Sequence, residues 1–123
     1  MPRIERLTYE ALAGGSPDTD AGTRVYPWIV GQDVPLPRIV YTRVSTAPVT
    51  SLSGSSGLDN VRMQVDCYAA TMPGALRLAS QVRTLLEGGG AGFTALLAGQ
   101  FDAYEPETKV FRQSLDFSCW EHL

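Results

Sequence analysis

Apolar and polar residues alternate most regularly between residues 60 and 69, and a period of two is typical of a strand with one buried face. The apolar positions of this segment are Val61, Met63, Val65, Cys67 and Ala69. The polar positions between them are Arg62, Gln64, Asp66 and Tyr68. Residues 38–46 and 109–120 show the same alternation, with Gln113 as the one polar residue in the apolar set of the second segment. The pattern therefore predicts three half-buried strands.

Two segments instead follow the 3.6-residue period of a helix. In the first, Ile4, Leu7 and Ala11 share one side, and glycines at 14 and 15 stop the helix. In the second, Thr71 is a suitable N-cap, and an apolar stripe follows it. That stripe consists of Ala75, Leu78, Ala79, Val82, Leu85 and Leu86. We expect a short N-terminal helix and a longer one that ends at the glycines from 88 onwards.

The remaining segments carry weaker patterns. Residues 24–30 indicate a short strand, which Pro27 restricts to a sheet edge. Residues 47–59 (APVTSLSGSSGLD) have no apolar period and predict a long loop, mobile in the free protein, between two strands. The Gly/Ala/Leu-rich residues 88–100 indicate a connector that leads to a short strand at residues 101–104, and residues 105–108 indicate a turn before the last strand.

The order of the expected elements is one helix, three strands, one helix and two strands. With a single helical crossover, this order predicts an α+β fold, a mostly antiparallel sheet with two helices packed on one face. A chain of 123 residues has the size of one compact domain, so we expect residues 1–123 to form a single domain.

Composition excludes several classes of function. The net charge of −3 has the wrong sign for a protein that binds nucleic acid by neutralising phosphates. No apolar run approaches the length of a membrane span, and the N-terminus does not read as a signal peptide, so we expect a cytosolic chain. Cys67 and Cys119 lack metal-ligand spacing, and His122 is the sole histidine. We therefore expect buried free thiols, no metal and no cofactor.

Candidate catalytic groups are present but unconvincing. The acidic residues of the strands and turns are Asp66, Asp102, Glu105, Glu107 and Asp116. We interpret them as solvated groups, because an acid–base pair needs a shared pocket that perturbs both pKa values. A nucleophilic triad would need His122, which lies at the C-terminus. The sequence thus indicates a protein without enzymatic activity.

Five stretches carry a resemblance to a known family. In chain order they are 24–27 (RVYP), 35–41 (PLPRIVY), 61–68 (VRMQVDCY), 104–108 (YEPET) and 111–120 (FRQSLDFSCW). Their order and spacing resemble the tail-completion or tail-terminator proteins of long-tailed bacteriophages. Arg38 and Cys119 depart from the pattern of many relatives. The family contributes no catalytic residues.

The resemblance implies a structural virion protein that forms a ring, hexameric in our expectation, at the head-proximal end of the tail. Its partners would be copies of itself, the tail tube protein and head connector or neck proteins. DNA would pass through the lumen without specific binding, no membrane is involved, and assembly would take place in the host cytoplasm. The polar face of the sheet, together with the serine-rich segment, supplies the candidate interface. The residues of this interface are Arg38, Arg43, Ser53, Ser55, Arg62, Gln64, Asp66, Tyr68, Arg112, Asp116 and Trp120.

Two alternatives remain open from the sequence. One is a neighbouring role in the virion, that of a head–tail connector or neck protein. The other is a small-molecule-binding or enzymatic α+β domain, for which a deep apolar pocket would be the diagnostic feature.

Overall fold

The computed structural model describes residues 3–13, 20–21, 24–28, 35–51, 54–88 and 92–121, and for a few of these only the backbone. The described elements confirm the predicted α+β class and the predicted order of helices and strands. In chain order they are α1 (Arg3–Ala13), β1 (Val25–Pro27), β2 (Arg38–Ser51), β3 (Gly54–Ala69), α2 (Met72–Leu86), β4 (Phe93–Glu105) and β5 (Val110–Glu121).

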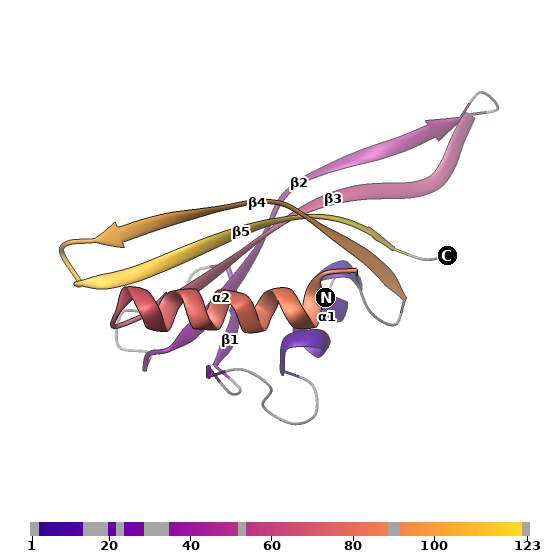
Figure 1. Ribbon diagram of the computed structural model, residues 1–123. Helices are drawn as coiled ribbons and strands as arrows, with labels where there is room; N and C mark the ends of the chain where they lie inside the picture. The colour runs from indigo at the N-terminus through magenta and orange to yellow at the C-terminus, as the bar shows by residue number, and fades with distance from the viewer. Residues whose placement is uncertain are drawn as a thin grey trace.

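In the described part of the chain the strands form one sheet of five, in the order β1-β2-β3-β5-β4. Every neighbouring pair is antiparallel except β1 and β2, which are parallel. The short strand β1 lies at one edge, where Pro27 does not interrupt a ladder, and β4 lies at the other edge. Both helices pack against the same face of the sheet, here called the helix face (Figure 1).

The core lies between the helices and the helix face. Every predicted apolar residue of β3 is buried there, as are Leu115, Phe117 and Cys119 of β5. Gln113, the polar exception in the apolar set of β5, is also fully buried. Its side chain accepts a hydrogen bond from Gln100 Nε2 and donates one to Asp102 Oδ1, so burial does not leave the amide without partners.

Helix α2 begins and ends as its sequence predicts. The Thr71 hydroxyl oxygen accepts a hydrogen bond from the Gly74 backbone N–H at 3.1 Å, which satisfies one of the free donors of the first turn. Gly88 follows the last turn with φ of +90°, a conformation that glycine adopts at little cost. The predicted stripe is buried along α2, with Leu85 only partly covered.

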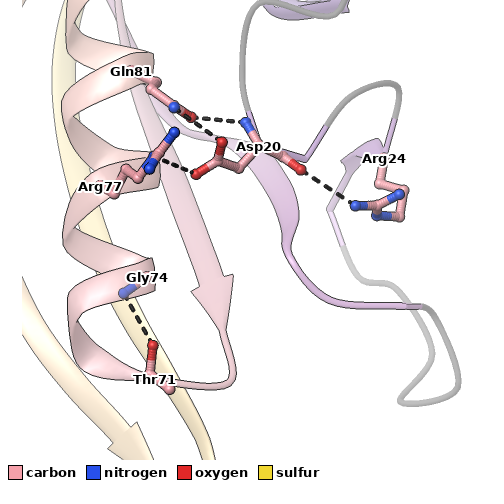
Figure 2. A network of polar contacts seen from close by, with 6 residues as sticks. All are labelled: Asp20, Arg24, Thr71, Gly74, Arg77 and Gln81. Atoms are coloured by element: carbon pink, nitrogen blue, oxygen red, sulfur yellow. Dashed lines mark hydrogen bonds and ion pairs between the residues drawn. The ribbon is translucent and has the colours of Figure 1, made fainter.

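Asp20 fastens the segment before β1 to the outer side of α2 (Figure 2). Its carboxylate is 2.9 Å from Arg77 Nε and accepts a hydrogen bond from Gln81 Nε2, while its backbone N–H donates to Gln81 Oε1 at 2.7 Å. Its carbonyl accepts from Arg24, whose Nε also donates to the Pro37 carbonyl. These contacts fix the entry to β1 relative to both the helix and β2.

The prediction of a long loop over residues 47–59 is wrong. Strands β2 and β3 continue through most of it, and their pairing extends to Ser51 and Gly54; residues 52 and 53 lie outside the described part. This end of the β2–β3 pair projects away from the helices as an arm (Figure 1). Because no core lies beneath it, backbone pairing forms the ladder without requiring alternating apolar side chains. Whether the arm is mobile in the free protein stays a prediction.

The predicted connector over residues 88–100 is wrong from residue 93 onwards, where β4 begins. Strand β4 pairs with β5 along its whole length, with an irregularity between Leu97 and Gly99. Only its first residues, Phe93 and Ala95, are buried in the core. The rest of the strand is largely exposed, so its sequence lacks the alternation by which a half-buried strand is recognised.

Candidate functional site

Most residues of the predicted interface lie together on the face of the sheet opposite the helices, here called the open face. The register of β2, β3 and β5 aligns Arg38 with Tyr68 and Arg112, and aligns Gln64 with Asp116. No helix or strand of the described chain packs on this face. The predicted interface residues that the register places on the open face are Arg38, Arg62, Gln64, Asp66, Tyr68, Arg112, Asp116 and Trp120.

The central ion pair of the open face joins β3 to β5. Arg62 faces the Asp116 carboxylate with both Nε and one terminal nitrogen, in a two-pronged geometry. The hydrogen bond that Arg62 donates to Asp116, reinforced by the negative charge of Asp116, raises the pKa of the Arg62 guanidinium. Register places Arg62 opposite Ser118, so the pair runs diagonally across the two strands. The charge of each partner is therefore already balanced within the subunit.

Asp66 is buried, with only 6% of its surface exposed, and this corrects the expectation of a solvated carboxylate. Its oxygens accept hydrogen bonds from Gln64 Nε2 at 3.0 and 3.1 Å and from the Ser114 hydroxyl at 2.6 Å. Ser114, directly opposite on β5, is fully buried. Two side chains thus hold Asp66 in place, and the carboxylate stabilises the sheet rather than serving as a free contact group.

Aromatic and cationic side chains cross the open face near the start of β2. The Arg38 guanidinium carbon is 4.8 Å from the centre of the Tyr68 ring, within the range of a cation–π contact. Burial raises the pKa of the Tyr68 phenol, the Asp66 charge raises it further, and Arg112 opposes both effects. Arg38 is itself buried. This row of side chains is therefore packed and partnered within one subunit.

Two apolar side chains on the open face were missed by the sequence reasoning. Leu96 is opposite Ser118 and Phe101 is opposite Ser114, so both point away from the helices. They are 50% and 52% exposed. Val44, in the irregularity of β2 between Arg43 and Ser45, is 59% exposed. Leu96 belongs to the segment predicted as a connector and Phe101 follows directly after it, and exposed apolar residues of this kind carry no signal of a half-buried strand.

The other members of the predicted interface lie elsewhere. Arg43 is on the helix face, where its Nε is 2.6 Å from Glu5 Oε1 of α1. Ser55 belongs to the arm, where only the backbone is described, and Ser53 lies outside the described residues. Arg43 therefore links a helix to the sheet, and no local pattern predicts a partner 38 residues away.

The described residues offer little for other kinds of chemistry. They contain no cluster of three or more histidine, cysteine or acidic side chains that could hold a metal, and no helix among them could span a membrane. A shallow groove of about 290 Å³ between α2 and β4 is lined mainly by polar side chains. Its lining residues are Leu76, Ser80, Arg83, Thr84, Glu87 and Gln100. This groove lacks the enclosed apolar walls typical of a small-molecule site.

Both cysteines are free and buried, as predicted. Cys67 is opposite Gln113 on β5, six positions from Cys119, so the two thiols are about 20 Å apart along the sheet. Burial raises the pKa of both thiols, with that of Cys119 reaching about 12. Neither thiol is available as a thiolate nucleophile at neutral pH.

Comparisons with known proteins agree with this picture of a structural protein. No curated protein matches the chain. A solved structure described as the virion of a native gene transfer agent (GTA) particle contains a chain that superposes with a TM-score of 0.71 at 17% sequence identity. The match covers 96% of this chain and 93% of that chain, so the two share a fold. The family model described as tail completion protein gp17 matches residues 10–122. Because that match spans nearly the whole sequence, the chain belongs to the tail completion protein gp17 family and is a structural protein of a phage tail.

Proposed function

We propose that this protein closes into a hexameric ring at the head-proximal end of the tail tube, stops further growth of the tube and joins the tail to the head connector. Membership of the tail completion family supports a role at a tail end. A ring requires a heterologous contact, in which one surface of a subunit meets a different surface of the next and the rotation closes.

The observation that carries the proposal is the composition of the open face. The charged side chains of this face already have partners within the subunit, as Arg62, Asp116 and Asp66 show. Leu96 and Phe101 lie exposed on the neighbouring strand β4. A contact over such a surface removes apolar area from water without leaving an unpaired charge buried. Exposed apolar side chains next to satisfied polar groups are typical of a surface that another protein covers.

The charge of the chain is compatible with passage of DNA. Six copies of a chain with net charge −3 sum to −18, and this excess of negative charge disfavours tight binding of the phosphate backbone. DNA would then slide through the lumen without specific contacts.

Electron microscopy of tails made without this protein tests the proposal. We expect overlong tails that carry no heads, because nothing would stop the tube or join it. Tails of normal length that fail to join heads would instead favour the alternative of a head–tail connector. Normal, infectious particles would contradict both roles in the virion and revive the small-molecule-binding alternative.

A further inference from the structure

We propose that the free edge of β4 pairs, as an added antiparallel strand, with the outer edge of β2 at residues 42–47 in a second copy of the chain. The sheet would then run continuously from one subunit to the next. This inference rests on the proposed ring, and it names the surfaces that form the contact.

Strand β4 is an unusually open edge. It has 13 residues, pairs only with β5 in the described sheet, and is not covered along its outer side by either helix. Proteins usually protect a long edge with proline, lysine or a covering segment. The sequence FTALLAGQFDAYE contains neither proline nor lysine, and its one irregularity lies between Leu97 and Gly99. At the start of the strand the Ala95 carbonyl accepts a hydrogen bond from the Gly88 N–H at 2.7 Å. From Leu96 onwards the outer backbone groups have no strand partner among the described residues, and together with the exposed Leu96 and Phe101 they form a template for another strand.

The opposite edge of the sheet offers a matching segment. Strand β1 covers β2 only at Ile39, Val40 and Tyr41, so the outer edge of β2 has no strand partner among the described residues from Thr42 onwards. Pro48 lacks an N–H and limits the segment that can accept a full ladder to residues 42–47. These six residues are long enough to pair with the exposed middle of β4.

Strand direction favours a head-to-tail contact between copies. Strands β2 and β3 are antiparallel, β3 and β5 are antiparallel, and β5 and β4 are antiparallel. Strand β4 therefore runs opposite to β2. When a second copy is placed beside the first in the same orientation, its β2 lies antiparallel to β4, the more stable arrangement for strand pairing. Such a contact uses different edges of the two copies, as a ring requires.

Charge and side-chain facing are consistent with this pairing. In the antiparallel arrangement the C-terminal part of β4, which carries Asp102, lies beside the start of the free β2 segment, which carries Arg43. Both side chains are on the helix face, because Asp102 is opposite Gln113 and Arg43 is opposite Met63. Arg43 already contacts Glu5 of its own α1 at 2.6 Å, so Asp102 would join an existing ion pair rather than meet a free charge.

Disulfide trapping in assembled rings tests the contact. One set of subunits carries Leu96→Cys or Phe101→Cys, and the other carries Thr42→Cys or Ser45→Cys; register places all four positions on the open face. The sets are mixed in equal amounts, assembled, oxidised and separated on non-reducing gels. The parent chain is the control, because Cys67 and Cys119 are buried. We expect disulfides between the two sets in at least one of the four combinations, and little bonding within a set.

The outcomes separate this inference from the proposed ring. Rings that form and terminate tails, yet give no disulfide between β4 and β2, overturn the strand pairing and leave the ring intact. Disulfides between two β4 strands overturn it in favour of a two-fold contact. Failure to form rings, with normal tails in the absence of the protein, overturns both proposals.

A pair of charge substitutions provides a second readout. Leu96→Lys and Phe101→Lys together place two positive charges on the open face beside the β4 edge. The double substitution should raise the concentration needed for ring formation on the order of tenfold. Leu76→Lys on α2, at a side chain that is 45% exposed, is the matched control and should leave ring formation unchanged. Equal loss from the control and the β4 variant would contradict a specific role for the edge.

Discussion

The two faces of the sheet differ in character although the same strands supply both. The helix face of β3 and β5 is almost wholly apolar and buried under α1 and α2 (Figure 1). The open face of the same strands carries paired charges, buried polar groups and a border of exposed apolar side chains. The difference shows that the helix face contributes the core of the subunit, and it supports our proposal that the open face meets a neighbour.

The largest expected effect follows from truncating the helix face. Phe117 is fully buried between the sheet and the helices, and Phe117→Ala should lower the free energy of unfolding by about 3–5 kcal/mol, because a cavity remains. Phe101→Ala on the open face of β4 is the matched control and should change it by roughly 0.5 kcal/mol or less. Urea unfolding followed by circular dichroism gives both values, and similar losses for the two variants would contradict the distinction between the faces.

Asp66 should be the exception on the open face. Asp66→Ala removes the acceptor of the Gln64 and Ser114 hydrogen bonds, and the buried hydroxyl loses its partner, so we expect a loss of about 1–3 kcal/mol in the same assay. Asp66→Asn keeps one acceptor oxygen and should recover part of the loss. If Asp66→Ala unfolds like the parent chain, the carboxylate is not part of the folded framework.

The buried thiols predict how stability depends on alkaline pH. Burial raises the pKa of Cys119 from 9.0 to about 12 in the folded chain. The folded state therefore holds this proton more tightly than the unfolded state, and the associated stability is complete below about pH 9 and is lost as pH rises towards 12. Cys119→Ala should show a shallower fall in stability over this range. Identical slopes in variant and parent would contradict the prediction, and the comparison cancels the contribution of the tyrosines.

The smallest effect concerns the ion pair of the open face. Side chains of Arg62 and Asp116 are 41% and 34% exposed, so solvent screens their attraction. A double-mutant cycle with Arg62→Ala and Asp116→Ala should give a small favourable coupling in the isolated subunit that decreases as salt is added. A coupling that does not respond to salt would mean that the pair is more buried than its exposure indicates.

The sequence identifies the parts of the fold that lie over the core. Alternation at 60–69 and 109–120 and the stripe after Thr71 identified β3, β5 and α2, because burial on one side imposes a period on each. The arm and the first part of β4 were missed for the opposite reason. The arm has no core beneath it and β4 is mostly exposed, so burial does not impose an alternation of apolar and polar residues on either.

The candidate interface was predicted in outline but not in its bonding. Because alternate residues of a strand share a face, the sequence was enough to place Arg62, Gln64 and Asp116 on one face of β3 and β5. Alternation does not reveal the register between strands, and the register determines that Arg62 meets Asp116 and that Ser114 reaches Asp66. Arg43 was assigned to the interface, whereas the structure pairs it with Glu5 of α1. Long-range partners of this kind depend on how α1 folds back over the sheet, which local patterns do not encode.

Hydrogen exchange compared between the isolated subunit and assembled rings tests directly whether the open face and the β4 edge meet a neighbouring subunit. We predict that amides of β4, residues 93–105, exchange more slowly in rings, because the edge and the open face become covered. Amides of α2 should change little. Residues 42–47 of β2 should gain protection together with β4. Rings in which β4 exchanges as fast as in the free subunit would contradict the claim that this side of the molecule meets a neighbour.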